Sequence, residues 1–151
     1  PEQRQRLVEE PELMGNAVEE VLRFEPSTHM MARTLTRNVE RHGRSMKEGS
    51  KVALILASAN RDERYWKNPD VFDVSRNTSG SLAFGLGIHH CLGASLARME
   101  GTVALQELMA GVPDFEVDIE KAERVHSGNV RGFSRLPISF TPSQDQRRTG
   151  S

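Results

Sequence analysis

The stretch LAFGLGIHHCLGASLARME, residues 82–100, holds Cys91, the only cysteine of the 151-residue chain. Gly85 and Gly87 precede it and Gly93 follows it, so the backbone is free to turn tightly and to bring amide groups close to the sulfur. A helix-like run begins directly after the cysteine. Since N–H donors and the positive end of a helix dipole both stabilise a thiolate, the stretch predicts a loop that holds an ionised sulfur.

A single cysteine also limits the chemistry of the chain. It excludes an intrachain disulfide, an all-cysteine zinc site and an iron–sulfur cluster held by this chain alone. His89 and His90 are adjacent and on an extended segment point to opposite sides, which disfavours a zinc site shared with Cys91. The ordinary alternative for a lone cysteine is a small buried hydrophobe.

Four positions of this stretch carry a resemblance to a known family. Phe84, Gly87, Cys91 and Gly93 reproduce the pattern FxxGxxxCxG, and SLARME continues it. The stretch resembles the haem loop of cytochrome P450 monooxygenases. The resemblance implies that Cys91 is the axial thiolate ligand of the iron of haem b, and so both the metal ligand and the catalytic residue. A thiolate ligand pushes electron density onto the iron and favours O–O cleavage.

The resemblance also assigns further contacts to the haem. His89 takes the position that hydrogen-bonds one propionate, and Arg33 takes that of the arginine that binds the other, where a guanidinium grips a carboxylate. A solvated strand arginine is the alternative for Arg33, and His90 has no counterpart beyond packing or exposure. The full expected set of cofactor-binding residues is Arg33, Ala83, Phe84, Gly85, His89, Cys91, Leu92, Gly93 and Ala97.

Glu20 and Arg23 lie three residues apart in a predicted helix, so their side chains share one face. Alone, this is a common surface pair. The resemblance implies a buried structural pair beneath the haem loop, joined by a third arginine. Val71 stands where relatives often carry that arginine, which leaves Arg61 and Arg76 as open candidates. The motif ANRDE, residues 59–63, also fits the family, where it is structural.

The periodicity predicts two helices, over 11–25 and 92–111, the second with Leu92, Leu96, Met99, Val103 and Leu108 on an apolar stripe and an end at Gly111 and Pro113. Strands are expected in 30–36, 51–59 and 115–119, with a hairpin over 124–140 that turns near Gly128 and turn points at Gly43 and Gly49. Residues 61–66 favour a short helix.

The predicted fold class is α+β, mostly helical with small β-sheets, corresponding to the K to L helices and haem loop of the cytochrome P450 fold. Residues 1–140 are expected to form the C-terminal part of that domain, and residues 141–151 a polar tail.

The charge balance bears on partners and location. The chain has 20 Lys and Arg against 21 Asp and Glu, so it has no large basic field for nucleic acid or an anionic membrane. No apolar run reaches the roughly 18 residues of a membrane span, and PEQRQRLVEE lacks the plan of a signal peptide. We therefore expect a cytoplasmic protein.

The resemblance runs from about residue 2 to 140 but covers only the C-terminal part of the family's fold. It implies a haem-thiolate monooxygenase that hydroxylates a small organic substrate and receives electrons from a ferredoxin and its reductase. The N-terminal part would supply the long helix over the distal haem face with its acid–alcohol pair, so we expect this chain to be inactive alone, and to self-associate through surface that the N-terminal part would cover.

Several residues have expected roles outside the haem loop. Thr28, His29, Met30 and the turn SGNVRG align with segments that border the substrate pocket in relatives. Arg98 either faces an acidic electron donor or is a solvated helix charge. Two other functions stay open: a non-catalytic haem-binding or interaction module, and, more weakly, a Cys–His hydrolase, for which the sequence offers no spaced third partner.

Overall fold

A computed structural model describes residues 2–112 and 114–141. The α-helices are α1 (Glu2–Glu9), α2 (Met14–Phe24), α3 (Leu56–Ala59) and α4 (Ala94–Gly111), and the 3-10 helices are η1 (Pro11–Leu13), η2 (Gly87–His89) and η3 (Ile119–Lys121). The strands are β1 (Met30–Thr34), β2 (Val39–Arg41), β3 (Arg44–Met46), β4 (Lys51–Ile55), β5 (Phe115–Val117), β6 (Glu123–Arg124), β7 (Phe133–Arg135) and β8 (Ile138–Phe140).

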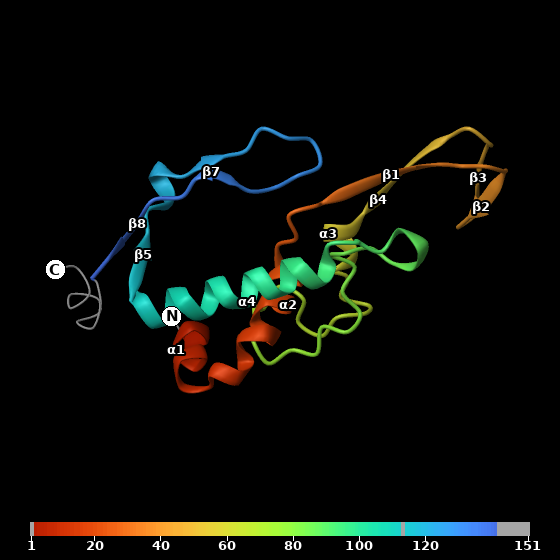
Figure 1. The fold of residues 1–151 in the computed structure, drawn as a ribbon. Coiled ribbons are helices and arrows are strands. Elements are labelled where there is room, and N and C mark those ends of the chain that lie inside the picture. Colours follow the sequence, from red (N-terminus) through yellow and green to blue (C-terminus); the bar gives the residue numbers. More distant parts are fainter. Residues whose placement is uncertain (1, 113, 142–151) are drawn as a thin grey trace.

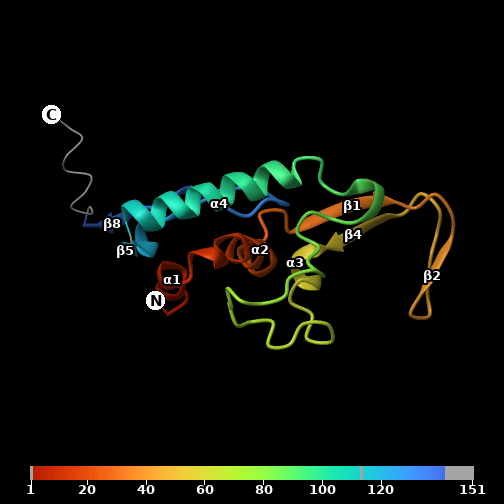
Figure 2. The same cartoon turned by 60° about the horizontal axis from the view of Figure 1, so that its bottom comes forward.

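Helix α4 is the long axis of the molecule, and α2 lies beside it (Figures 1 and 2). Gly101 permits this close approach, because a Cβ there would lie 3.0 Å from Cγ1 of Val18 on α2. Within the described residues the strands form four two-stranded antiparallel sheets, pairing β1 with β4, β2 with β3, β5 with β8 and β6 with β7. The β1–β4 and β2–β3 ribbons extend beyond the start of α4, while β5 and β8 lie at its other end (Figure 1).

The hydrophobic core is small and lies where α1, α2 and the end of α4 meet. Its buried members are Leu7, Met14, Ala17, Val74 and Met109. Helix α1 was not anticipated from the sequence, because its residues are polar apart from Leu7 and Val8. Leu7 is the side chain of α1 that is buried in the core, while Gln3 and Arg4 form hydrogen bonds with the backbone of Val74 and Phe115. A helix that buries one apolar side chain gives no amphipathic stripe from which it can be predicted.

The predicted helix over 11–25 is confirmed, with a 3-10 turn at Pro11–Leu13 ahead of α2. The segment 51–59 is strand only as far as Ile55 and then turns into α3. The short helix expected over 61–66 was wrong, because that segment consists of turns, such as the one closed by the Trp66 N–H on the Asp62 carbonyl.

The C-terminal strands follow the prediction in part. β5 confirms a strand at 115 but ends at Val117, before η3. β6 and β7 form the expected hairpin, whose connecting loop contains Gly128, whereas β8 turns back to pair with β5. Gly43 and Gly49 have φ of 70° and 82°, as turn points require. Pro113 and residues 142–151 of the expected tail lie outside the described residues.

The predicted helix with its apolar stripe is present as α4, but much of the stripe lies outside the contact with α2. Leu96, Met99 and Val103 are 54%, 58% and 51% exposed, and the face that meets α2 carries Ala97 and Gly101 instead. Small residues let two helices approach, whereas periodicity alone does not say which apolar face is covered. No helix in the described part of the chain has both the length and the apolar character needed to cross a bilayer.

Candidate functional site

The cysteine loop is built on two left-handed glycines. Gly85 and Gly87 have φ of 71° and 68°, a conformation that residues with a Cβ adopt only with strain. The turn they create lets the N–H of Cys91 donate to the Phe84 carbonyl over 2.9 Å. Gly93 has an ordinary φ of −84° and serves as the N-cap of α4, so its role is not the tight turn that the sequence suggested. The loop thus presents Cys91, exposed and free, just before the N-terminus of α4.

Cys91 lines a hollow of about 510 Å³ together with His89 and Arg33, which reaches it from β1. The rest of the lining is Leu22, Pro26, Ser27, Thr28, Met31, Leu54, Leu56, Leu82, Ala83, Phe84, Gly85 and Leu86. Aliphatic side chains from α2, β4 and α3 therefore face a thiol, an imidazole and a guanidinium. This combination suits an apolar ligand that contains both carboxylates and a metal ion that a thiolate can ligate.

Six of the nine residues predicted to bind a cofactor line this one hollow: Arg33, Ala83, Phe84, Gly85, His89 and Cys91. The other three do not line it. Leu92 is fully exposed, Gly93 is the N-cap of α4, where a Cβ would lie 4.0 Å from Cys91 Sγ, and Ala97 lines the groove between α2 and α4 with Val18 and Gly101.

The basic groups of the hollow are available for an acidic ligand. Arg33 donates from Nη1 to its neighbouring Ala32 carbonyl over 2.9 Å, and among the described residues no carboxylate pairs with it. His90 instead packs against the loop, with Nδ1 3.4 Å from the Gly85 oxygen and its ring edge-on to Phe84. Within the described chain neither His89 nor His90 hydrogen-bonds a carboxylate, so the orienting group of a Cys–His hydrolase is missing there.

Glu20 and Arg23 form a fully buried ion pair behind the loop. Nε of Arg23 donates to Oε2 of Glu20 over 2.7 Å, and Nη2 to Oε1 over 2.9 Å. The third arginine is Arg76, whose Nε donates to Oε1 of Glu20 over 3.1 Å. Arg61, the other candidate, binds the Phe24 carbonyl and Asp70. The open choice between them is thereby decided.

Asn60, in the motif ANRDE, connects this pair to the cysteine loop. Its carbonyl accepts from Nη1 of Arg23 over 2.7 Å, and its side-chain Oδ1 accepts from the N–H of Leu82 over 2.8 Å. Leu82 begins the loop, and Asn60 is fully buried. The sequence identified the motif, but it did not show that Asn60 links the buried ion pair to the cysteine loop.

The pKa of a carboxyl group next to the Glu20–Arg23 pair, that of Asp73, is also shifted. Asp73 donates its backbone N–H to Oε1 of Glu20 over 3.0 Å. The pKa of the Asp73 carboxyl is lowered, first because the Ser75 hydroxyl donates to it and then because the Ser75 N–H does, with smaller effects from the charges of Arg6 and Arg76. Asp73 therefore stays ionised where it closes the turn next to Glu20.

The family model for cytochrome P450 matches residues 3–140. The chain belongs to the cytochrome P450 family. Among curated relatives it is 43% identical to cytochrome P450 CYP199A2 of Rhodopseudomonas palustris, over 95% of this chain and 34% of that protein. It is 42% identical to the biotin biosynthesis cytochrome P450 of Bacillus subtilis, over 93% and 35%. The chain thus spans about a third of the length of these relatives.

Solved cytochrome P450 structures have the same fold over this region. A structure of P450BioI in complex with hexadec-9Z-enoic acid ligated acyl carrier protein matches with a TM-score of 0.88 and 39% identity, over 93% of this chain and 37% of that one. The structure of cytochrome P450 CYP109Q5 from Chondromyces apiculatus matches with a TM-score of 0.89 and 39% identity, over 95% and 37%. The chain therefore has a partial cytochrome P450 fold, with helices and small sheets.

In this P450 fold the segments expected to border a substrate pocket are hydrogen-bonded to each other, but they line two separate hollows. Thr28 lines the hollow of Cys91, as does Met31 in place of the expected Met30. His29 lines a second hollow, of about 320 Å³, with the turn 127–132, and its N–H donates to the Asn129 carbonyl over 2.9 Å. Its buried Nε2 has no hydrogen-bond partner among the described residues.

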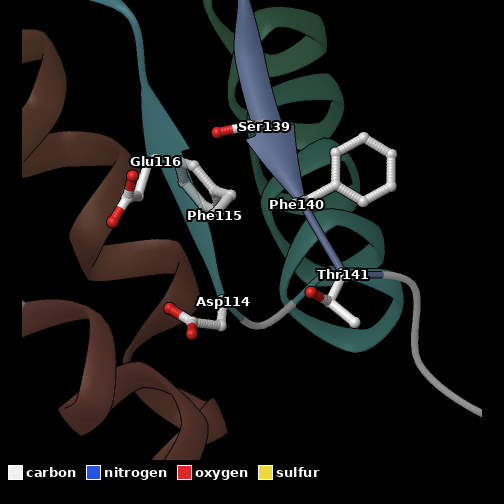
Figure 3. Close-up of a pocket in the computed structure, with 6 residues that line it drawn as sticks. All are labelled: Asp114, Phe115, Glu116, Ser139, Phe140 and Thr141. Carbon is white, nitrogen blue, oxygen red and sulfur yellow. The ribbon is translucent and has the colours of Figure 1, made fainter.

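A third hollow, of about 280 Å³, is lined by residues of the paired strands β5 and β8 and by Asp114 and Thr141 next to them, at the far end of α4 from Cys91 (Figures 1 and 3). Figure 3 shows Phe115 directed toward β8, and Asp114 and Glu116 on the other side of β5. The described residues contain no group of three or more His, Cys, Asp or Glu side chains that could hold a metal ion. This hollow lacks the thiol and the paired basic groups that mark the hollow of Cys91.

Proposed function

We propose that this chain is the haem-thiolate part of a cytochrome P450 monooxygenase, in which Cys91 ligates the iron of haem b. One observation carries the proposal: Cys91, His89 and Arg33 line a single, largely apolar hollow. Membership of the cytochrome P450 family supports monooxygenase chemistry at the level of the family. The assignment of these three residues to the haem rests on the resemblance of the cysteine loop and on their placement in one hollow.

The residues of the hollow fit the cofactor. Haem is a flat apolar ring with an iron at its centre and two carboxylates at one edge. Aliphatic side chains of α2, β4 and the loop supply the apolar wall, and Arg33 has no carboxylate partner in the described chain. A guanidinium that pairs with no carboxylate of the described residues and an imidazole are suitable partners for two propionates, and a thiolate is a soft donor that suits iron.

Each residue then has a defined task. Cys91 would hold the iron and supply electron density to it through its sulfur, and its N–H bond to the Phe84 carbonyl fixes the backbone that carries the sulfur. Arg33 and His89 would orient the cofactor by binding its carboxylates, and the aliphatic wall would exclude water from its face. When bound, haem supplies the iron centre at which dioxygen is activated and a substrate carbon–hydrogen bond is oxidised.

The substrate and partners of the whole enzyme belong to this proposal as well. We expect a small organic substrate, electrons from a ferredoxin and its reductase, and a cytoplasmic location. Because the chain spans about a third of its relatives, we expect these 151 residues to be inactive by themselves. A second candidate is a non-catalytic haem-binding or interaction module, because haem binding in the hollow of Cys91 does not by itself require turnover. Stoichiometric haem binding without turnover, in the presence of an electron donor and the complete polypeptide, would favour that candidate.

The decisive experiment replaces the ligand. The haem-loaded polypeptide is reduced and treated with carbon monoxide, and the red-shifted Soret band of thiolate ligation is expected. Cys91→Ser should abolish this band. Ile88→Ser is the matched control, because Ile88 lies in the same loop, is 97% exposed and does not line the hollow, so the band should persist. A band that is unchanged in Cys91→Ser, or absent from the unmodified protein, overturns the proposal.

A further inference from the structure

Arg98, in the second turn of α4, makes two contacts that join separate parts of the molecule. Its guanidinium lies over the ring of Phe84, 4.6 Å from the ring centroid. The same guanidinium pairs with Glu19 on α2, through Nε to Oε1 and through Nη2 to Oε2 over 3.4 Å. Arg98 therefore connects α4, α2 and the cysteine loop.

Phe84 is the residue that fixes the backbone of Cys91. The Phe84 carbonyl accepts the Cys91 N–H over 2.9 Å, while the Phe84 ring lies under the Arg98 guanidinium. A displacement of the ring would move the carbonyl, and with it the amide that carries the sulfur. The side chains of Arg98 and Glu19 are 40% and 25% exposed, so the pair is partly shielded from water.

We propose that Arg98 is a positioning residue for the thiolate: held by Glu19, it clamps the Phe84 ring and so fixes the Cys91 backbone. The role requires arginine, because a planar guanidinium stacks on a ring and binds a carboxylate at once, whereas an ammonium does both less well. It also bears on the expectation that Arg98 faces an acidic electron donor. Glu19 already neutralises its charge, which leaves little for such a partner.

The test compares three variants in the whole polypeptide that carries these residues. Arg98→Lys removes the planar group, Glu19→Gln releases it from the α2 side, and Phe84→Leu removes the ring while keeping an apolar side chain. Arg64→Gln is the control, because Arg64 also pairs with a carboxylate, that of Asp62, but its side chain is 86% exposed and its hydrogen bonds within the described residues go to Asp62. The unfolding midpoint of each variant is measured in parallel.

Two readouts report on the loop without haem. Hydrogen exchange of the Cys91 amide and the rate of Cys91 alkylation by iodoacetamide should both rise about three- to tenfold in the three variants, and stay unchanged in Arg64→Gln. If a variant does not fold, the remaining two still decide the outcome. Exchange and alkylation rates equal to those of the unmodified protein, at equal stability, overturn the proposal, as does full retention of both rates in Arg98→Lys.

A third readout rests on the proposed function. In the haem-loaded protein reduced under carbon monoxide, Arg98→Lys and Glu19→Gln should lose the thiolate Soret band about three- to tenfold faster than Arg64→Gln does. Equal rates of loss contradict a positioning role toward the metal. If no haem binds at all, the proposed function fails, while exchange and alkylation still report on the clamp. The two failures are therefore distinguishable.

Discussion

Nε of Arg76 donates to Oε1 of Glu20 over 3.1 Å, and the same guanidinium donates to the carbonyls of Lys67, Asn68 and Val71 over 2.7–3.0 Å. Arg76 thus connects the segment 67–71 to the fully buried Glu20–Arg23 pair. Its side chain is only 11% exposed. The pair stabilises the fold because each of its charges meets several donors or acceptors, whereas a buried charge without partners is costly.

Arg76→Lys should therefore be destabilising even though it keeps the charge. Lysine cannot reach Glu20 and three carbonyls together, and the expected loss is about 3 kcal/mol of unfolding free energy. Arg64→Lys is the control, because Arg64 pairs with Asp62 on an exposed turn and its side chain is 86% exposed, so no measurable loss is expected there. Urea unfolding followed by circular dichroism measures both. Equal losses would mean that Arg76 is not the third member of the network.

Asp73 makes the stability depend on acid. The Ser75 hydroxyl and N–H lower the pKa of its carboxyl in the folded state, so the stability that Asp73 contributes is fully present above its unfolded pKa, about 4. It is lost as the pH falls through the lower pKa of the folded state. The urea midpoint should drop less between pH 7 and pH 3 in Ser75→Ala and in Asp73→Asn than in the unmodified chain. A drop of the same size in all three contradicts this assignment.

The sequence predicted those parts of the site in which a residue type meets a backbone requirement. Gly85 and Gly87 have the left-handed φ that only glycine adopts without strain, and Glu20 and Arg23 share a helix face by spacing alone. The choice of Arg76 over Arg61 was not predictable, because both are arginines at suitable distances along the chain. Only the tertiary path of the segment 60–76 brings one of them to Glu20.

The outward direction of the α4 stripe had a different cause. Leu96, Met99 and Val103 have the spacing of a buried helix face, yet Gly101 and Ala97 meet α2 because small residues permit close packing. Periodicity identifies an apolar face but not what covers it. For the same reason Arg98 was not recognised as a link, since its partner Glu19 and the ring of Phe84 come from other elements.

Alanine in place of a left-handed glycine and alanine in place of a helical glycine should change the stability of the protein in opposite directions. Gly87→Ala introduces a Cβ at φ of 68°, which should cost about 1 kcal/mol although no atom lies within 4 Å of the new group. Gly15→Ala, in helix α2 and equally free of contacts, should instead stabilise by about 0.5 kcal/mol. Unfolding midpoints of both variants test this, and a gain in stability from Gly87→Ala would contradict the backbone argument.

The exposed face of α4 gives a prediction about association. Leu96, Met99 and Val103 are each more than half exposed and lie on one helix face. An apolar surface of this kind promotes contacts between molecules. We expect the 151-residue chain, studied by itself, to self-associate with rising concentration, as measured by gel filtration with light scattering.

Replacing the three residues together, as Leu96→Gln, Met99→Gln and Val103→Thr, should shift the chain toward a monomer without loss of helix content, because none of them is buried in the described core. A control with three scattered exposed residues, Val71→Thr, Ile119→Thr and Val125→Thr, removes a similar number of apolar side chains from separate places and should leave association as it was. If the unmodified chain stays a monomer over the whole concentration range, the exposed face of α4 does not promote self-association, and the prediction is wrong. If instead both triple variants reduce association equally, the contact is spread over the surface and does not belong to α4.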